Sequence, residues 1–220
     1  MNWFTPALAA HLPELAARLH IECRIDRPAV ALTFDDGPHA QGTPAVLEEL
    51  ARRGATATFF LVGEQVVQRP ALACEIVAAG HEVAVHGFRH TLLLRRRAAA
   101  VTDDFDRAVD AIGEATGVRP ILYRPPYGIL SAGALAEVRA RGWRPLLWSA
   151  WGRDWERRAT PQSIARRATR RLGPGAVVLL HDSDAYSSAD SWRRTAASLP
   201  SVLDAVAALD VPASSVTQST

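Results

Sequence analysis

Short apolar runs alternate with longer amphipathic stretches between residues 29 and 209. The apolar runs have the length of buried strands, and the stretches between them are rich in Ala, Arg and Glu and have the length of helices. This alternation predicts an α/β fold with a parallel sheet or barrel. Six or seven units are too few for a complete eight-fold barrel. The expected strands are residues 29–34, 55–61, 82–85, 121–123, 145–149 and 176–180, and the expected helices are residues 43–53, 64–79, 98–116, 131–141, 160–171 and 195–209.

The two ends of the chain depart from this pattern. Residues 3–18 predict a short amphipathic helix and residues 20–25 an edge strand, which together make an N-terminal unit of residues 1–27. We expect residues 28–210 to form the α/β domain, and the small polar side chains of residues 211–220 predict a flexible tail. The first twenty residues lack a basic segment and are interrupted by Pro6, His11 and Pro13. This predicts neither a signal peptide nor a membrane span and favours a cytoplasmic protein.

Composition narrows the class of protein. A chain of 220 residues with 48% apolar content fits one globular domain and excludes wholesale disorder. The formal net charge is +2, and all 25 basic residues are arginine. Pairs such as Arg166-Arg167 and Arg170-Arg171 recur at helical spacing, which favours a solvated helix face over a nucleic-acid groove. We therefore expect no nucleic-acid partner, and the pattern indicates no particular oligomeric state.

Polar clusters follow five of the expected strands. The carboxyl ends of parallel strands meet at one edge of a sheet, and ligands bind there. We therefore expect the clusters to form one site. They are Asp35-Asp36, His86 to His90, Arg124 to Tyr127, Asp154-Trp155 and His181-Asp182.

One of these clusters has metal-ligand character. His86 and His90 are four residues apart, so a helical turn would place both imidazoles on one face. With one carboxylate of Asp35-Asp36 they complete a set of two histidines and one carboxylate, which leaves coordination positions open for water and substrate. The set predicts a catalytic divalent metal. Zinc fits the ligand types, as do cobalt, manganese, nickel and iron; the alternatives are an Asp-Asp-Gly surface turn and a structural histidine pair.

The other polar residues have both a catalytic and a structural interpretation. His181 ends an apolar run, where a nearby carboxylate would place its pKa close to the working pH, or it is a core histidine. Asp154 would orient His181 or pair with Arg124, or it is a surface residue. Arg124 would fix a catalytic carboxylate or cap a helix. Trp155 and Leu179 would form an apolar slot beside the site, or they belong to the core.

Taken together, these motifs resemble those of the polysaccharide deacetylase family, the family 4 carbohydrate esterases with a NodB homology domain. The resemblance runs from about residue 28 to residue 182 and implies a distorted (β/α)7 barrel, here with a short N-terminal helix. It also implies metal-dependent removal of an acetyl group, usually from an N-acetylated amino sugar. The motifs that carry it are Thr33 to Pro38, His86 to His90, Arg124 to Tyr127, Asp154-Trp155 and Leu179 to Asp182.

The resemblance implies metal-binding and proton-transfer roles for five residues. The metal ligands would be Asp36, His86 and His90. The general base that activates water would be Asp35. The general acid that protonates the leaving nitrogen would be His181.

Supporting roles follow for five more residues. Arg124 would hold the base, and Asp154 would tune the acid. The backbone N–H of Tyr127 would help to stabilise the oxyanion. Trp155 and Leu179 would line the pocket that accepts the acetyl methyl group.

The chain departs from the family pattern in three places. Gly87 stands where the family usually has Ser or Thr, which removes a local hydrogen bond but no ligand. Trp151 stands where a further Asp is usual, which removes a charge from the rim of the site. The polar segment of residues 182–192 forms either part of the substrate rim or a solvated loop.

The motifs leave the substrate open. The absence of an export signal favours a sugar or glycoconjugate that contains N-acetylglucosamine over a cell-wall polymer. The same site would also hydrolyse a formyl group, a cyclic imide or an acetyl ester of xylan. A barrel that binds glycans without turnover is a further alternative, and the complete set of catalytic positions argues against it.

Overall fold

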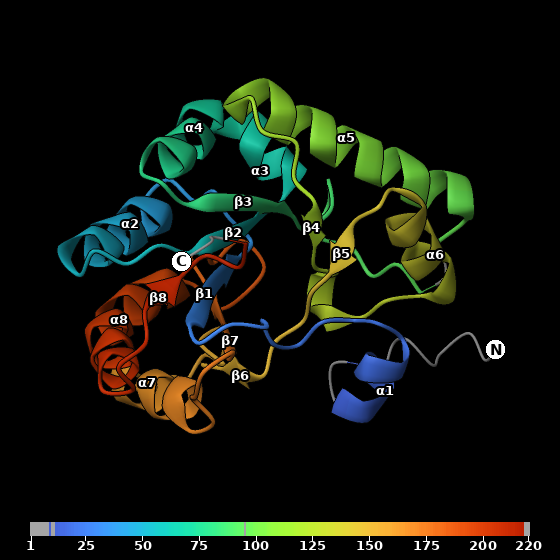
Figure 1. Cartoon of the computed structure of the whole chain (residues 1–220). Coiled ribbons are helices and arrows are strands. Elements are labelled where there is room, and N and C mark those ends of the chain that lie inside the picture. The colour runs from blue at the N-terminus through green and yellow to red at the C-terminus, as the bar shows by residue number, and fades with distance from the viewer. Residues whose placement is uncertain (1–8, 10–11, 95, 218–220) are drawn as a thin grey trace.

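A computed structural model describes residue 9 and residues 12–94 and 96–217 of the chain. At its centre is a parallel sheet in the order β5-β4-β3-β2-β1-β7-β6, with β8 paired to β1. The sheet curls, and the helices lie on its outer side (Figure 1). The predicted α/β fold of barrel type is thereby confirmed. The strands are β1 Val30–Asp35, β2 Thr58–Leu61, β3 Glu82–Val85, β4 Leu122–Tyr123, β5 Arg144–Pro145, β6 Ala150–Trp151, β7 Val177–His181 and β8 Ala213–Ser214.

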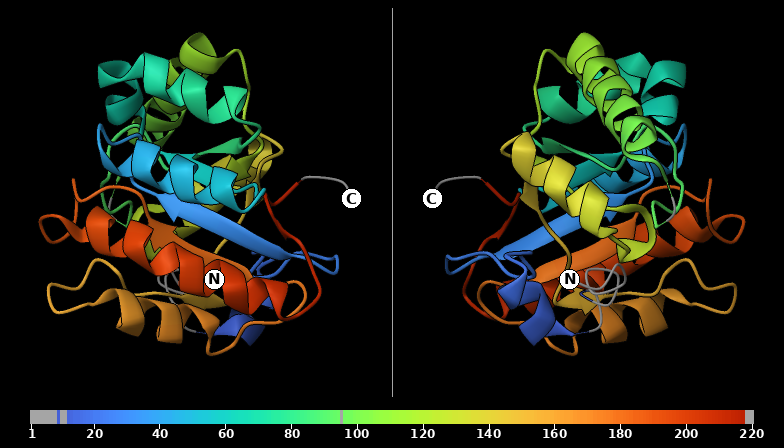
Figure 2. Two further views of the ribbon diagram at one scale, coloured as in Figure 1. Left: turned by 90° about the vertical axis from the view of Figure 1, so that its left-hand side faces the viewer. Right: turned by 90° about the vertical axis from the view of Figure 1, so that its right-hand side faces the viewer.

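The helices form an outer layer around the sheet. Figure 2 shows α2, α8 and α7 stacked over one side of the molecule, with α5 and α6 over the opposite side. A short 3₁₀ turn, Pro126–Gly128, follows β4. The α-helices are α1 Pro13–Arg18, α2 Gly42–Arg52, α3 Gly63–Gln68, α4 Pro70–Ala78, α5 Ala98–Thr116, α6 Ala132–Ala140, α7 Pro161–Thr169 and α8 Ser191–Ala207.

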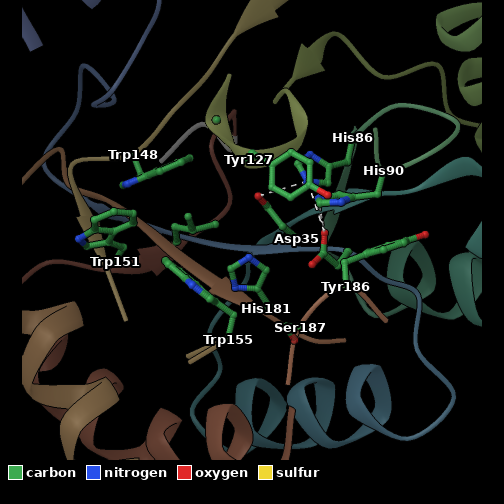
Figure 3. A pocket seen from close by; sticks show the side chains of 13 residues that line it. Asp35, His86, His90, Tyr127, Trp148, Trp151, Trp155, His181, Tyr186 and Ser187 are labelled. Carbon is green, nitrogen blue, oxygen red and sulfur yellow. Dashed lines mark ion pairs between the residues drawn. The ribbon is translucent and has the colours of Figure 1, made fainter. Parts of the chain in front are cut away.

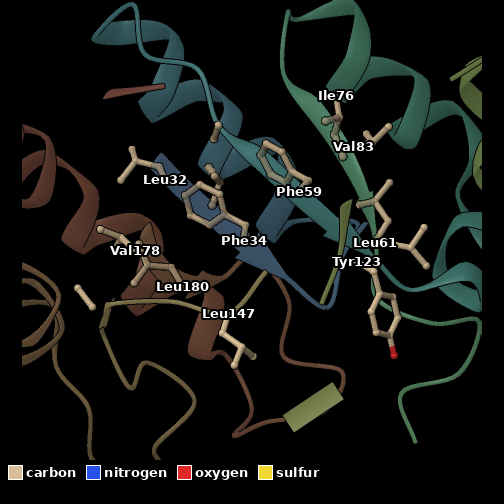
Figure 4. Packing of buried hydrophobic residues seen from close by; sticks show 14 of the residues in the cluster. Leu32, Phe34, Phe59, Leu61, Ile76, Val83, Tyr123, Leu147, Val178 and Leu180 are labelled. Carbon is tan, nitrogen blue, oxygen red and sulfur yellow. The ribbon is translucent and has the colours of Figure 1, made fainter. Parts of the chain in front are cut away.

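The central strand β1 is buried along its whole length, which explains its mostly apolar sequence. Successive side chains of a strand point to opposite faces of the sheet. Leu32 and Phe34 therefore pack in the core under the helices, whereas Ala31 packs in a second cluster inside the curled sheet. Figure 4 shows Leu32 and Phe34 with Phe59 in the first of these clusters. The same alternation places Asp35, the last residue of β1, on the inner face.

Two expected elements are divided in the structure. The helix predicted for residues 64–79 is wrong as one helix, because α3 ends at Gln68 and α4 begins at Pro70. Proline has no N–H and disfavours helical geometry in the residue before it, and Arg69 has φ −140° and ψ 56°. The strand predicted for residues 145–149 is also wrong as one strand. Here β5 pairs with β4 and β6 pairs with β7, so the intervening residues cross from one edge of the sheet to the other.

The N-terminal segment lies across this opening between the sheet edges. The edge strand predicted for residues 20–25 is replaced by two isolated bridges, a parallel one from Glu22 to Leu146 and an antiparallel one from Arg24 to Ala176. They link the β5 side of the opening to the β7 side. The helix predicted for residues 3–18 begins at Pro13 in the structure, and residues 1–8, 10 and 11 lie outside the described residues.

The C-terminal segment is not the flexible tail predicted from its composition. Ala213 and Ser214 form β8, which pairs in parallel with β1. Val216 is 4% exposed, and its N–H donates to Thr58 Oγ1 at 2.8 Å and to Glu82 Oε2 at 3.1 Å. Residues 218–220 of the expected tail lie outside the described residues. In the part of the chain that the structure describes, no helix is long and apolar enough to cross a membrane.

Candidate active site

The predicted strand-end clusters meet in one pocket with a volume of 340 Å³. It lies at the carboxyl ends of the strands, and residues that follow β1, β3, β4, β6 and β7 line it. Figure 3 shows their side chains. Two predicted site residues, Arg124 and Asp154, lie behind the pocket wall and are fully buried. The residues that line the pocket are Asp35, Asp36, His86, His90, Tyr127, Gly128, Trp148, Trp151, Trp155, Leu179, His181, Tyr186 and Ser187.

Asp36, His86 and His90 form a compact group on one side of the pocket. One ligand atom from each residue lies within 4.8 Å of the other two. His90 Nε2 is 3.3 Å and His86 Nε2 is 3.5 Å from Asp36 Oδ1. Asp36 has a left-handed backbone with φ 79°, so its carboxylate does not follow the alternation of the strand before it.

The protonation and hydrogen bonding of this group fit a divalent cation. His86 Nδ1–H donates to the Arg124 carbonyl oxygen at 2.8 Å, which turns the Nε2 lone pair toward the pocket. Asp36 Oδ1 is buried without a hydrogen-bond partner. Burial raises the pKa of Asp36, but the imidazoles around it lower the pKa further, so the carboxylate is ionised. Burial lowers the pKa of His90 to about 4, which leaves a neutral imidazole able to bind a metal.

The histidine pair does not lie on a helix, contrary to the expectation from its spacing. Residues 86–90 form a loop after β3. Gly87 has φ 86°, in the region that favours glycine, and a Cβ there would lie 3.0 Å from Asp104 Oδ2. The Asp104 carboxylate on α5 accepts hydrogen bonds from the N–H groups of Phe88 and Arg89 at 2.9 and 3.1 Å. The departure at Gly87 therefore suits a turn that α5 fixes, and no motif pointed to Asp104.

Asp35 lies next to Asp36, His86 and His90, and the buried Arg124 binds its carboxylate from the side away from the pocket. Arg124 Nη1 donates to Asp35 Oδ1 at 2.6 Å and to Thr33 Oγ1 at 2.9 Å. The remaining guanidinium donors reach the carbonyl oxygens of Leu146 and Leu147. Arg124 was expected either to fix a carboxylate or to cap a helix, and the structure shows that it contacts the Asp35 carboxylate. The other oxygen of Asp35, Oδ2, is 3.7 Å from His86 Nε2 and faces the pocket.

His181 lies across the pocket from the metal group and contacts Asp154. Its Nδ1–H donates to Asp154 Oδ1 at 2.9 Å, and its backbone N–H donates to Asp154 Oδ2 at 2.7 Å. Thr195 O–H on α8 donates to Asp154 Oδ2 at 2.7 Å. Burial lowers the pKa of His181, but Asp154 raises it more, with smaller contributions from Asp36 and Asp35, to about 10. This pKa lies above the value near the working pH that we expected.

The three remaining predicted residues also line the pocket. Tyr127 is 58% exposed, has φ 60°, and its ring centroid lies 4.5 Å from that of His90. The ring centroids of Trp155 and His181 are 5.3 Å apart. Leu179 is 3% exposed, in the central part of β7. The structure thus brings together all ten residues that the motifs had indicated.

Sequence reasoning missed two aromatic neighbours of the site. Tyr186 stacks on His90 with ring centroids 4.3 Å apart, and its hydroxyl donates to Glu64 Oε1 at 2.7 Å. Tyr186 and Ser187 belong to the polar segment 182–192, so this part of the segment forms the rim rather than a solvated loop. Trp148 lines the opposite wall. The one available signal for Tyr186 was an aromatic residue soon after the His181 motif.

Asp182 is a further buried carboxylate beneath the site. It is 0% exposed and accepts a hydrogen bond from Thr43 Oγ1. Burial, together with the charge of Asp36, raises the pKa of Asp182 to about 7 against the effect of Thr43. Its carboxylate packs against Gly37, where any Cβ would collide with it. Asp182 therefore supports the turn that follows Asp35 and Asp36.

The fold and site define a class: curled parallel α/β barrels with a group of two histidines and one carboxylate at the strand ends. Within this class, the chain belongs to the polysaccharide deacetylase family, whose family model, described as polysaccharide deacetylase, matches residues 24–146. A chitooligosaccharide deacetylase of Bradyrhizobium is 41% identical over 155 residues, which cover 70% of each chain. The peptidoglycan-N-acetylglucosamine deacetylase PgdA of Listeria monocytogenes is 34% identical over 153 residues. That match covers 70% of this chain and 32% of the relative, so the chain spans about a third of its length.

Solved structures agree with this assignment. A family 4 carbohydrate esterase from Streptomyces lividans, in complex with acetate, superposes with a TM-score of 0.76 at 31% identity. The alignment covers 86% of this chain and 92% of the esterase. The peptidoglycan N-acetylglucosamine deacetylase Bc1960 gives a TM-score of 0.82 at 23% identity, which supports the fold alone.

Proposed function

We propose that this chain is a metal-dependent hydrolase that removes the N-acetyl group from a sugar or glycoconjugate containing N-acetylglucosamine. The observation that carries the proposal is the arrangement of two supported proton-transfer groups around one metal-type cluster. Asp35 is held by Arg124, and His181 is held by Asp154. Both face the pocket that also contains Asp36, His86 and His90. Hydrolysis of an amide needs an activated water, a polarised carbonyl and a protonated leaving nitrogen, and these groups match those needs.

Asp36, His86 and His90 would hold the metal. A divalent ion bound there would lower the pKa of a bound water and polarise the substrate carbonyl. Zinc is the ion that two imidazoles and one carboxylate favour, and cobalt, manganese, nickel or iron would accept the same ligands. The buried, unpartnered Asp36 Oδ1 and the Nε2 atoms of both histidines support this assignment.

Asp35 would take the proton from the attacking water. Its Oδ2 faces the metal group, while Oδ1 is engaged by Arg124, so the carboxylate is fixed in one orientation. A base held in this way needs little reorganisation when the proton moves. The backbone N–H of Tyr127 would donate to the oxyanion, where a fixed donor is worth about 3 kcal/mol.

His181 would protonate the leaving nitrogen. Its pKa of about 10 keeps the imidazole protonated at neutral pH, so the proton is in place before the C–N bond breaks. Nδ1 is engaged by Asp154, which leaves Nε2 as the donor toward the substrate. Trp155 and Leu179 would line the slot that receives the acetyl methyl group.

The test is hydrolysis by the zinc-loaded protein of N-acetylated chito-oligomers, peptidoglycan fragments and nucleotide sugars. We expect one acetate and one free amine for each N-acetyl group hydrolysed, detected by mass spectrometry and amine labelling. Asp35→Asn is expected to retain zinc and lose turnover by orders of magnitude, whereas His86→Ala is expected to lose the zinc. If Asp35→Asn deacetylated at a near-normal rate, the role of Asp35 as base would be wrong. Release of formate from the matching N-formyl compounds, with no acetate from the N-acetyl compounds, would assign a different acyl group to the same site.

A further inference from the structure

One wall of the active-site pocket consists of three tryptophans. The ring centroids of Trp148 and Trp151 are 5.6 Å apart with 28° between their planes. Those of Trp151 and Trp155 are 5.4 Å apart, and Trp155 in turn contacts the His181 ring edge to face. The result is an aromatic surface that starts beside His181 and continues past Trp155.

Strand pairing fixes this surface relative to the pocket floor. Trp151 on β6 is the register partner of Leu179 on β7. Partner residues of neighbouring parallel strands point to the same face, so Trp151 and Leu179 present one continuous apolar surface. Leu179 is 3% exposed and therefore forms the floor. A charged side chain at position 151, as the family pattern usually has, would interrupt this surface.

The two sides of the pocket differ in polarity. Figure 3 shows Trp148, Trp151 and Trp155 on the opposite side of His181 from His86, His90 and Tyr186. Tyr186 and Ser187 carry hydroxyls that both donate and accept hydrogen bonds. An indole offers one N–H donor and no acceptor, and leucine offers neither. A sugar ring has hydroxyls that need both kinds of partner, so the polar side suits the sugar and the tryptophan side suits a hydrocarbon group.

The size of the apolar side decides which hydrocarbon group it fits. In the proposed function the acetyl methyl lies against Trp155 and Leu179, and Trp155 contacts the ring of His181. Trp148 and Trp151 would then line space that the substrate does not fill. The whole pocket has a volume of 340 Å³, within the range of about 300–1,000 Å³ typical of small-molecule sites.

We propose that the site accepts N-acyl amino sugars with acyl chains longer than acetyl and prefers them, with Trp148, Trp151 and Leu179 binding the chain. This inference rests on the proposed amide hydrolysis. Water adds its oxygen to the acyl carbonyl, the C–N bond breaks, and the nitrogen takes a proton, giving a carboxylic acid and a free amino sugar. The amino sugar is the same in every such substrate, and only the acyl chain differs. Trp151, which contacts that chain, is therefore a specificity residue for the acyl group.

The experiment uses the zinc-loaded protein and a series of glucosamines carrying N-acetyl, N-propanoyl, N-butanoyl or N-hexanoyl groups. Burial of each added methylene is expected to raise kcat/KM about fourfold until the pocket is full. Trp151→Asp is expected to abolish the rise, and Trp151→Phe to retain part of it. Trp143→Phe is the matched control, because Trp143 packs against Phe105 and Tyr123 in the core away from the pocket. The circular dichroism and thermal midpoint of each variant check its folding.

A second readout does not need turnover. Calorimetric titration with acetate, butanoate and hexanoate is expected to show tighter binding of the longer carboxylates to the wild type and not to Trp151→Asp. The inference is overturned if kcat/KM falls from acetyl to propanoyl, if Trp151→Asp keeps the wild-type ratios, or if hexanoate binds no more tightly than acetate. Acetyl hydrolysis without length preference would leave the proposed function intact. Absence of amine release from every compound would instead refute the proposed function.

Discussion

Arg124 Nη1 lies 2.6 Å from Asp35 Oδ1, and the two side chains are only 0% and 4% exposed. The pair is surrounded by partners that use the remaining donors, including Thr33 Oγ1 and the carbonyl oxygen of Leu147. The Phe60 ring centroid lies 4.0 Å from the guanidinium carbon. Burial lowers the pKa of Arg124, and Asp35 opposes this effect. The arginine therefore both supports the core of the barrel and orients the carboxylate.

Replacing Arg124 by Met is expected to cost about 3–5 kcal/mol of unfolding free energy, because Asp35 would remain buried without its partner. Chemical denaturation measures this loss. The control is Arg52→Met, since Arg52 is 57% exposed and pairs with Glu48 and Glu49 on the surface of α2. That change is expected to cost less than about 1 kcal/mol. Equal losses for the two variants would contradict the structural role of Arg124.

Asp154→Asn is expected to lower the pKa of His181 below its value of about 10, because the neighbouring carboxylate supplies most of the upward shift. Nuclear magnetic resonance of the imidazole nitrogens at several pH values measures the pKa of His181. Asp184→Asn is a control, since Asp184 faces His39 at 3.4 Å instead of His181. An unchanged titration of His181 in Asp154→Asn would show that another group holds the proton.

The same pair makes stability depend on pH. The pKa of His181 in the folded chain, about 10, is above the ordinary value of 6.5, so the folded state binds the proton more tightly. This contribution is complete below about pH 6.5 and is lost as the pH rises through about 10. The stability difference between the wild type and Asp154→Asn is therefore expected to be largest near pH 6 and to shrink toward pH 10. Denaturation at several pH values gives this difference.

The raised pKa of Asp182 is expected to make the stability of the fold depend on pH in a second, lower pH range. Its pKa of about 7 is above the ordinary value of 3.8, so its contribution is complete below about pH 3.8 and is lost as the pH rises through about 7. The Asp182→Asn substitution would keep an acceptor for Thr43 Oγ1 and remove the charge. This variant is therefore expected to gain stability relative to the wild type as the pH rises from about 4 to about 7. A constant difference across that interval would show that Asp182 does not titrate there.

The sequence was most informative where a strand end carries a polar cluster. The first strand, His86 and His181 were placed correctly because apolar runs bounded by polar residues mark buried parallel strands. The orientation of Asp35 toward Arg124 depends on contacts between residues 89 positions apart, which local patterns do not encode. For the same reason, the expectation of a helical turn at His86 to His90 failed. Its geometry is fixed by Asp104, on the next helix.

The two-residue strands β6 and β8 could not be predicted from the sequence pattern. β6 is Ala150-Trp151, and nothing in so short a segment distinguishes a strand from a loop. Its pairing with β7 places Trp151 beside Leu179, and this contact forms the apolar wall. β8 was missed for the same reason, since Ala213-Ser214 is short and consists of small side chains like those of a loop. Both strands exist because a long strand of the sheet offers them unpaired backbone groups.

The C-terminal strand leads to a prediction about truncation. A chain ending at Val211 would lose the β8 pairing to β1 and the buried side chain of Val216. Burial of a valine contributes about 1.5 kcal/mol and each net hydrogen bond about 1 kcal/mol. We therefore expect the unfolding free energy to fall by about 2–4 kcal/mol, measured by urea denaturation.

A matched truncation after Thr217 tests whether this loss comes from β8. It removes residues 218–220 and keeps the hydrogen bond from the Val216 N–H to Thr58 Oγ1 at 2.8 Å. Its unfolding free energy is expected to match that of the full chain. Val216→Ala in the full chain separates side-chain burial from strand pairing, because the backbone of β8 remains. If the chain ending at Val211 were as stable as the one ending at Thr217, residues 212–217 would contribute nothing to the sheet, as their composition had first indicated.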